Sequence, residues 1–140
     1  MSECKAMSTP LEQNAKLYNE YGSKKADGTL YHQLVGSLNY LTTTRLYIAY
    51  LVSILSQFMA KPLESHWKAT NKVLRYLKGT INFGIMYTDD IDVDLTGFSD
   101  SDWARNPDDR RCTSGYEFHI GSGVVSWSSK KQPIASLLST

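Results

Sequence analysis

The residues of this 140-residue chain that could do chemistry lie together in one short segment, GFSDSDWAR, which runs from Gly97 to Arg105. Because side chains alternate along a strand, Phe98, Asp100 and Asp102 would share one face of it. Two carboxylates on one face repel each other unless a cation or a proton lies between them. The segment therefore predicts either a site for a divalent metal such as Mg²⁺, which prefers oxygen ligands, or a solvated strand end.

A metal site of this kind would suit phosphodiester hydrolysis, in which two ions activate a water and stabilise the leaving oxygen. Such sites take three or four carboxylates from different elements. The predicted strands offer only Glu117 beyond the pair Asp100 and Asp102. Two aspartates spaced as DxD are a weak signal on their own, so the solvent-exposed strand end stays open as the alternative.

Basic residues form a second group of candidates, because lysine and arginine can contact nucleic-acid phosphates. They are Lys68, Lys72 and Arg75 on one side of a predicted helix and, further along the chain, Arg110, Arg111, Lys130 and Lys131. A solvated outer face is the alternative interpretation of the helical stripe. Trp127 could offer a stacking surface or pack in the core. The chain as a whole has 15 basic and 14 acidic residues, so its overall charge does not indicate nucleic-acid binding.

The elements that must position these residues change type along the chain, and together they predict an α+β fold. Residues 1–29 are polar and predict an extended lead-in. Apolar residues at helical spacing predict helices over residues 30–41, 47–59 and 63–77, the last stopping at Gly79. A short strand at Phe83 to Tyr87 is expected next, then antiparallel strands at 95–101, 115–120 and 123–129. Gly121 to Gly123 would form the tight turn between the last two.

The sequence also argues against several classes of protein. Cys4 and Cys112 lie far apart without CxxC spacing, which indicates neither a zinc site nor a disulfide framework. The N-terminus lacks the apolar core of a signal peptide, and the stretch from Leu46 to Ala60 is too short for a membrane span. We therefore expect an intracellular protein, cytoplasmic or nuclear, with no membrane partner.

Several long motifs, which occur in the family's order, resemble the Pol polyprotein of Ty1/copia-type LTR retrotransposons. They are CKAMSTPLEQNAKL, YHQLVGSLNYLTTTR, HWKATNKVLRYLKGTINFGIMY and GFSDSDWARNPDDRRCTSGYEFHIGSGVVSWSSKKQP. The resemblance covers essentially the whole chain.

This resemblance implies three regions. Residues 1–29 would be the end of the reverse transcriptase, residues 30–88 a helical connecting segment ending in a short strand, and residues 95–140 an incomplete RNase H-like domain with a three-stranded antiparallel sheet. In that family, RNase H cleaves RNA in RNA–DNA hybrids with two Mg²⁺ ions. The family's first catalytic carboxylate falls on Asp100, with Asp102 as the competing position.

The chain also departs from the family pattern. The motif that brings the catalytic glutamate would follow Thr140, and Leu46 and Tyr47 stand where the family has a Pro-Asp pair that starts a helix. We therefore expect a catalytically incomplete fragment that binds Mg²⁺ weakly. The alternatives are a nucleic-acid-binding or interaction module without catalysis, and a translated remnant with no molecular function. An unpaired sheet edge would favour self-association.

Overall fold

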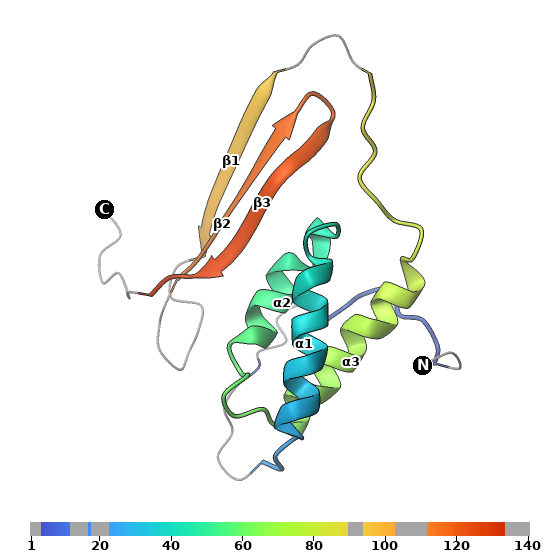
Figure 1. Cartoon of the computed structure of the whole chain (residues 1–140), viewed down its shortest axis with the longest axis vertical. Coiled ribbons are helices and arrows are strands. Elements are labelled where there is room, and N and C mark those ends of the chain that lie inside the picture. The colour runs from blue at the N-terminus through green and yellow to red at the C-terminus, as the bar shows by residue number, and fades with distance from the viewer. Residues whose placement is uncertain (1–3, 12–16, 18–22, 90–93, 103–111, 134–140) are drawn as a thin grey trace.

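The computed structural model describes residues 4–11, 17, 23–89, 94–102 and 112–133. These residues form helices in the N-terminal half and an antiparallel sheet in the C-terminal half, which confirms the predicted α+β class (Figure 1). The helices are α1 (Gly28–Leu41), α2 (Ala49–Ser56) and α3 (Glu64–Gly79), with one 3₁₀ turn at Leu46–Ile48 before α2. The strands are β1 (Leu95–Asp102), β2 (Thr113–Ile120) and β3 (Gly123–Lys131).

The helices begin and end for local reasons. The Asp27 side chain accepts a hydrogen bond from the Leu30 amide at 3.0 Å and so caps the start of α1. The second helix is shorter than predicted at both ends. At its start, Ile48 provides no side-chain cap. At its end, the amides from Gln57 onward make hydrogen bonds of the 3₁₀ type, which tighten the last turn. No helix in the described part of the chain has the length and apolarity needed to cross a bilayer.

The hydrophobic core lies among the three helices and the 3₁₀ turn. Its buried members are Tyr31, Val35, Leu38, Ile48, Leu51, Val52, Leu55, Ala69 and Val73. Tyr31 is fully buried, and its hydroxyl donates to the Leu55 carbonyl at 2.9 Å near the end of α2. Burial disfavours the phenolate and raises the pKa of Tyr31 to about 12. The core thus contains a neutral hydroxyl that joins α1 to α2.

Arg45, between α1 and α2, holds the end of α3. Its guanidinium donates to the carbonyls of Thr80 at 3.1 Å and Ile81 at 2.8 Å, to the Phe83 carbonyl, and to the Tyr47 hydroxyl at 2.9 Å. Carbonyls at the end of a helix lack intrahelical partners, and a cation there is favourable. One side chain therefore fixes the point at which the chain leaves the helices.

The short strand predicted at Phe83 to Tyr87 does not form, and that prediction was wrong. Residues 83–89 have no regular secondary structure. The Tyr87 hydroxyl donates to the Val124 carbonyl at 2.7 Å, and its ring occupies the space that a side chain at position 123 would need. Apolar residues favour a strand only where a neighbouring strand can pair with it, and here side chains attach the segment instead.

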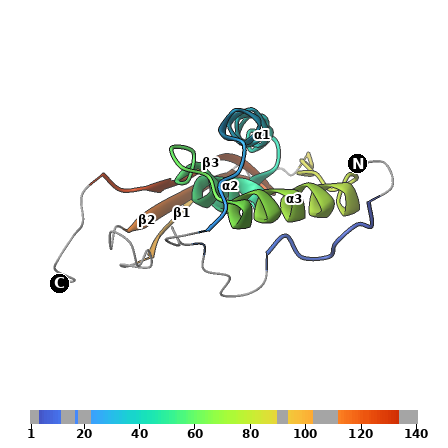
Figure 2. The same ribbon diagram turned by 90° about the horizontal axis from the view of Figure 1, so that it is seen from below.

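The sheet has the order β1-β2-β3, with both pairs antiparallel, so the three predicted strands are confirmed. Each strand is slightly longer than predicted. An irregularity between Phe118 and His119 shifts the register of β2 against β3. In Figures 1 and 2, β3 is the strand nearest the helices.

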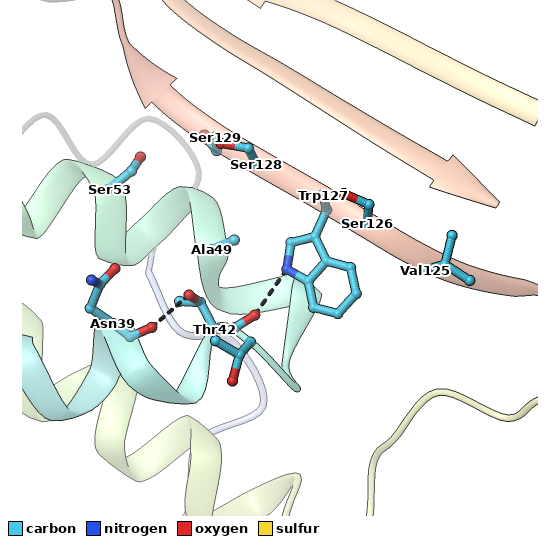
Figure 3. Close-up of a pocket in the computed structure, with 10 residues that line it drawn as sticks. Asn39, Thr42, Ala49, Ser53, Val125, Ser126, Trp127, Ser128 and Ser129 are labelled. Carbon is cyan, nitrogen blue, oxygen red and sulfur yellow. Dashed lines mark hydrogen bonds between the residues drawn. The ribbon is translucent and has the colours of Figure 1, made fainter.

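Trp127 of β3 joins the sheet to the helices. Its indole Nε1 donates to the Thr42 carbonyl, just after α1, at 2.9 Å (Figure 3). Further along β3, the Lys131 ammonium donates to the Gln57 side chain at 3.1 Å. Trp127 is half-buried, which agrees with packing as one of its two predicted roles. These two contacts join β3 to the end of α1 and to the end of α2.

We expect the Tyr31→Phe variant to be less stable than the parent chain by about 1 kcal/mol near neutral pH, because the Leu55 carbonyl loses the hydroxyl donor and keeps the Phe58 amide. The pKa of Tyr31 is raised from 10.0 to about 12 in the folded state. Its stabilising contribution is therefore complete below pH 10 and is lost as the pH rises toward 12. Denaturant unfolding of both proteins across this range should show the difference shrinking. A constant difference would contradict the burial of the hydroxyl.

We expect Trp127→Phe to weaken the sheet selectively, because the smaller phenyl ring lacks the indole N–H that donates to Thr42. Hydrogen exchange of amides in β2 and β3 should become about fivefold faster, which corresponds to about 1 kcal/mol. Amides of the helices should keep their rates. Trp67→Phe, in α3, is the matched control and should leave the sheet unchanged. Equal acceleration in the helices and the sheet would contradict the joining role of Trp127.

Candidate functional site

Asp100 and Glu117 lie on the face of the sheet that looks toward the helices. Residues directly opposite in an antiparallel pair share a face. Phe98 is opposite Glu117 and Asp100 is opposite Gly115, so the two carboxylates are diagonal neighbours. Glu117 is also opposite Trp127, whose indole bonds to the helical part. The sheet therefore places Asp100 and Glu117 on the side of Trp127.

A cleft of about 250 Å³ lies between this face and the helices. The sheet contributes Phe98, Asp100 and Glu117, while the helical side contributes Leu46, Ala49 and Tyr50. A second cavity of about 340 Å³ also borders Trp127 and is lined mainly by small polar side chains, among them Asn39, Ser53 and Ser126 (Figure 3). The sequence did not predict the α2 wall of the first cleft, because nothing in a helical pattern says which strand will lie opposite.

The two carboxylates have different surroundings. Asp100 is exposed to solvent. Glu117 Oε1 lies 3.4 Å from His119 Nε2, although this nitrogen is buried without a hydrogen-bond partner in the described part of the chain. The His119 ring stands edge-on to Phe98, with ring centroids 5.6 Å apart. Glu117 thus has a neighbouring imidazole, whereas Asp100 is open to solvent and is the more available ligand.

The described residues supply only part of a metal site. Among them no group of three or more His, Cys, Asp or Glu side chains is placed to hold an ion. Asp102 pairs with Thr113 at the end of β1, and its side chain lies outside the described part. A Mg²⁺ ion on two carboxylates would keep most of its water ligands. The pair does not fit a two-metal catalytic centre.

The basic residues of α3 are partly occupied by contacts within the chain. Lys68 is exposed and lies 3.9 Å from Glu64, one helical turn earlier. Lys72 is half-buried and has a partner of its own. Arg75 Nε donates to the Lys5 carbonyl at 2.8 Å, so the N-terminal segment lies against this end of the helix. Of the predicted stripe, Lys68 is the residue whose ammonium is most available to a phosphate.

The remaining basic candidates lie away from α3. Lys130 is exposed near the end of β3, and Lys131 donates to Gln57. Figure 1 shows this end of β3 well separated from α3. Arg110 and Arg111 lie outside the described residues. Among the described residues, the predicted phosphate contacts of α3 and β3 therefore do not lie together on one surface.

Several known proteins are similar to this chain in sequence. No family model matches the chain, and no solved structure matches it. The retrovirus-related Pol polyproteins from transposons RE2 and RE1 of Arabidopsis thaliana are 43% and 45% identical to it over 132 residues. Each match covers 94% of this chain and 9% of the relative. The secreted RxLR effector protein 161 of Plasmopara viticola is 45% identical over 111 residues, which are 79% of this chain and 78% of that protein.

Proposed function

The chain belongs to the family of Pol polyproteins of Ty1/copia-type retrotransposons, and we propose that it spans the junction between the reverse transcriptase and the RNase H domain. Residues 1–29 are the end of the reverse transcriptase, residues 30–88 the connecting segment, and residues 95–140 the first part of the RNase H-like domain. The order of three helices and then an antiparallel sheet supports this division. Such a polyprotein acts on nucleic acid inside the cell, which is where we place this chain.

Asp100 takes the role of the first catalytic carboxylate in this proposal. The observation that carries it is the position of Asp100 on a β1 strand that borders an open cleft, with its side chain exposed. Asp102 remains the competing residue at the end of the same strand. In the parent polyprotein, carboxylates of this kind would hold Mg²⁺ for the hydrolysis of RNA in RNA–DNA hybrids.

The described residues on their own are catalytically incomplete. Asp100 has Glu117 as its neighbour in the cleft, and Glu117 lies beside His119. Because a two-metal centre takes three or four carboxylates, further ligands would have to come from other parts of a longer polyprotein. Asp100 would then contribute one ligand, and the connecting helices would position β1.

A second candidate function is nucleic-acid binding without catalysis. The exposed ammonium groups of Lys68 and Lys130 favour it, since a solvated lysine can exchange its counterions for phosphates. Affinity for nucleic acid would then fall steeply with salt and would not depend on Asp100. Binding of Mg²⁺ at Asp100 would support the first function, and a nucleic-acid affinity that falls steeply with salt would support the second.

We expect Mg²⁺ to bind this chain no more tightly than about 1 mM, because the described carboxylates leave most of its coordination to water. Two-dimensional NMR during a MgCl₂ titration should show weak, unsaturated shifts at the amides of Asp100 and Gly115. The Asp100→Asn variant should lose them. Asp94→Asn, just before β1, is the control and should keep them.

The outcome also decides whether catalysis is worth measuring. Binding well below about 1 mM that only Asp100→Asn abolishes would contradict the incomplete site, and cleavage of a labelled RNA–DNA hybrid should then follow. Equal shifts in the Asp100→Asn and Asp94→Asn variants would show that Asp100 does not bind the metal.

A further inference from the structure

A cavity beside the C-terminal end of α3 has no part in the candidate site at Asp100, and we call it the α3 pocket. Its volume is about 470 Å³, within the range of about 300–1,000 Å³ that small-molecule sites occupy. Its lining comes from the end of α1 and the turn after it, the last turns of α3, and the N-terminal segment at Cys4. Figure 2 shows residues 4–11 running beside α3. Because these segments meet only in the folded chain, no local sequence pattern predicts the pocket.

One wall of the α3 pocket is apolar. Leu74, Leu77 and Ile81 follow one another at intervals of three and four residues, which places them along one side of the end of α3. Leu41, the last residue of α1, belongs to the same lining. Ile81 is 70% exposed and the three leucines are half-buried, so apolar surface remains open to a ligand.

Three cations, Arg45, Arg75 and Lys78, border the same cavity. In the described part of the chain, no acidic residue is among those that line it. The Arg45 guanidinium bonds to backbone carbonyls and to one tyrosine hydroxyl, and Arg75 Nε bonds to the Lys5 carbonyl. All of these partners are neutral. Within the described residues, therefore, no carboxylate balances the charge of either guanidinium.

Arg75 is the side chain best suited to bind an anion in the α3 pocket. It is half-buried, and its Nε donates to the Lys5 carbonyl at 2.8 Å, whereas its two terminal nitrogens have no partner among the described residues. Paired N–H groups on a planar guanidinium match two oxygens of a carboxylate or a phosphate. Free carbonyls at a helix end repel anions, but Arg45 donates to the carbonyls of Thr80 and Ile81 at this end.

We propose that the α3 pocket binds a small amphipathic anion, a molecule with a hydrocarbon chain and one carboxylate or phosphate head group. The chain lies against the leucines and Ile81, and the head group binds Arg75 near the charge of Arg45. A neutral apolar molecule would leave the guanidiniums without a counter-charge, and an inorganic anion would leave the apolar wall in water, so the occupant needs both parts. The inference goes beyond the proposed function, because the α3 pocket shares no lining residue with the cleft at Asp100.

Cys4 reports on the α3 pocket, because it lines the cavity and is exposed, whereas Cys112 is buried. The test is the rate at which iodoacetamide, a neutral reagent, alkylates Cys4 in the full chain, followed by mass spectrometry. Decanoate, kept below the concentration at which it forms micelles, should slow this rate about fivefold once about four-fifths of the protein is bound. Decyl phosphate tests the other head group, and the ligand that protects at the lower concentration identifies which head group fits better.

Decanol and inorganic phosphate are the ligand controls, because each has only one of the two parts. Each should need an at least tenfold higher concentration for the same protection, roughly the effect of losing one charged hydrogen bond. An octamer of single-stranded DNA has phosphates but no hydrocarbon chain, and should leave the alkylation rate of Cys4 unchanged.

Ile81→Asp puts a carboxylate into the α3 pocket at an exposed position and should abolish protection by decanoate. Met86→Asp is the matched control, because Met86 is 78% exposed in the same segment and does not line the cavity, so protection should persist. Arg75→Gln should weaken decanoate binding about tenfold. Lys68→Gln removes a charge from the same helix outside the pocket and should have no effect. Each variant is compared with and without ligand, so a change in the reactivity of Cys4 itself cancels.

Four results would overturn the proposal: no protection by decanoate or decyl phosphate, protection by decanol or the DNA octamer at the same concentration as decanoate, equal losses in Ile81→Asp and Met86→Asp, or faster alkylation of Cys112 with ligand. The last would mean that the ligand unfolds the chain as a detergent. A failed Mg²⁺ titration would leave this proposal standing, since Asp100 has no part in it.

Discussion

Burial of α2 is the constraint on which the rest of the structure depends. This helix has eight residues and no side-chain cap, so it would not persist alone in water. Leu51, Val52 and Leu55 are buried against the other helices, and each buried aliphatic side chain contributes roughly 2 kcal/mol. The other side of α2, with Ala49 and Tyr50, borders the cleft beneath the sheet. The same short helix completes the core and forms one wall of the candidate site.

Arg45 and Tyr47 connect the start of α2 to the end of α3. Tyr47 stands edge-on to Tyr76 at 5.8 Å and to Phe83 at 6.4 Å, and its hydroxyl accepts a hydrogen bond from Arg45. The weak start of α2 is thus offset by contacts between distant segments, and these contacts also direct the chain from α3 toward the sheet.

The sheet separates two kinds of chemistry because its side chains alternate. One face carries Asp100 and Glu117 beside the helices, where additional ligands would have to approach from the same side. The other face carries the exposed apolar side chains of Phe118 and Ile120. Because the two faces do not share side chains, each can be altered without direct contact with the other.

The sequence by itself determined the class of the fold, its elements and the family. Local spacing was enough for this: apolar residues at helical intervals predicted α1 and α3, alternation and the glycine turn predicted β1 to β3, and the motif around Asp100 predicted the candidate carboxylate. It failed at residues 83–87, where the apolar run has no partner strand among the described residues and is held by hydrogen bonds from Arg45 to Phe83 and from Tyr87 to Val124. Only the tertiary structure decided that Arg75 contacts the N-terminal segment and that α2 faces Asp100. These outcomes depend on which distant segments pack together, and spacing along the chain does not contain that information.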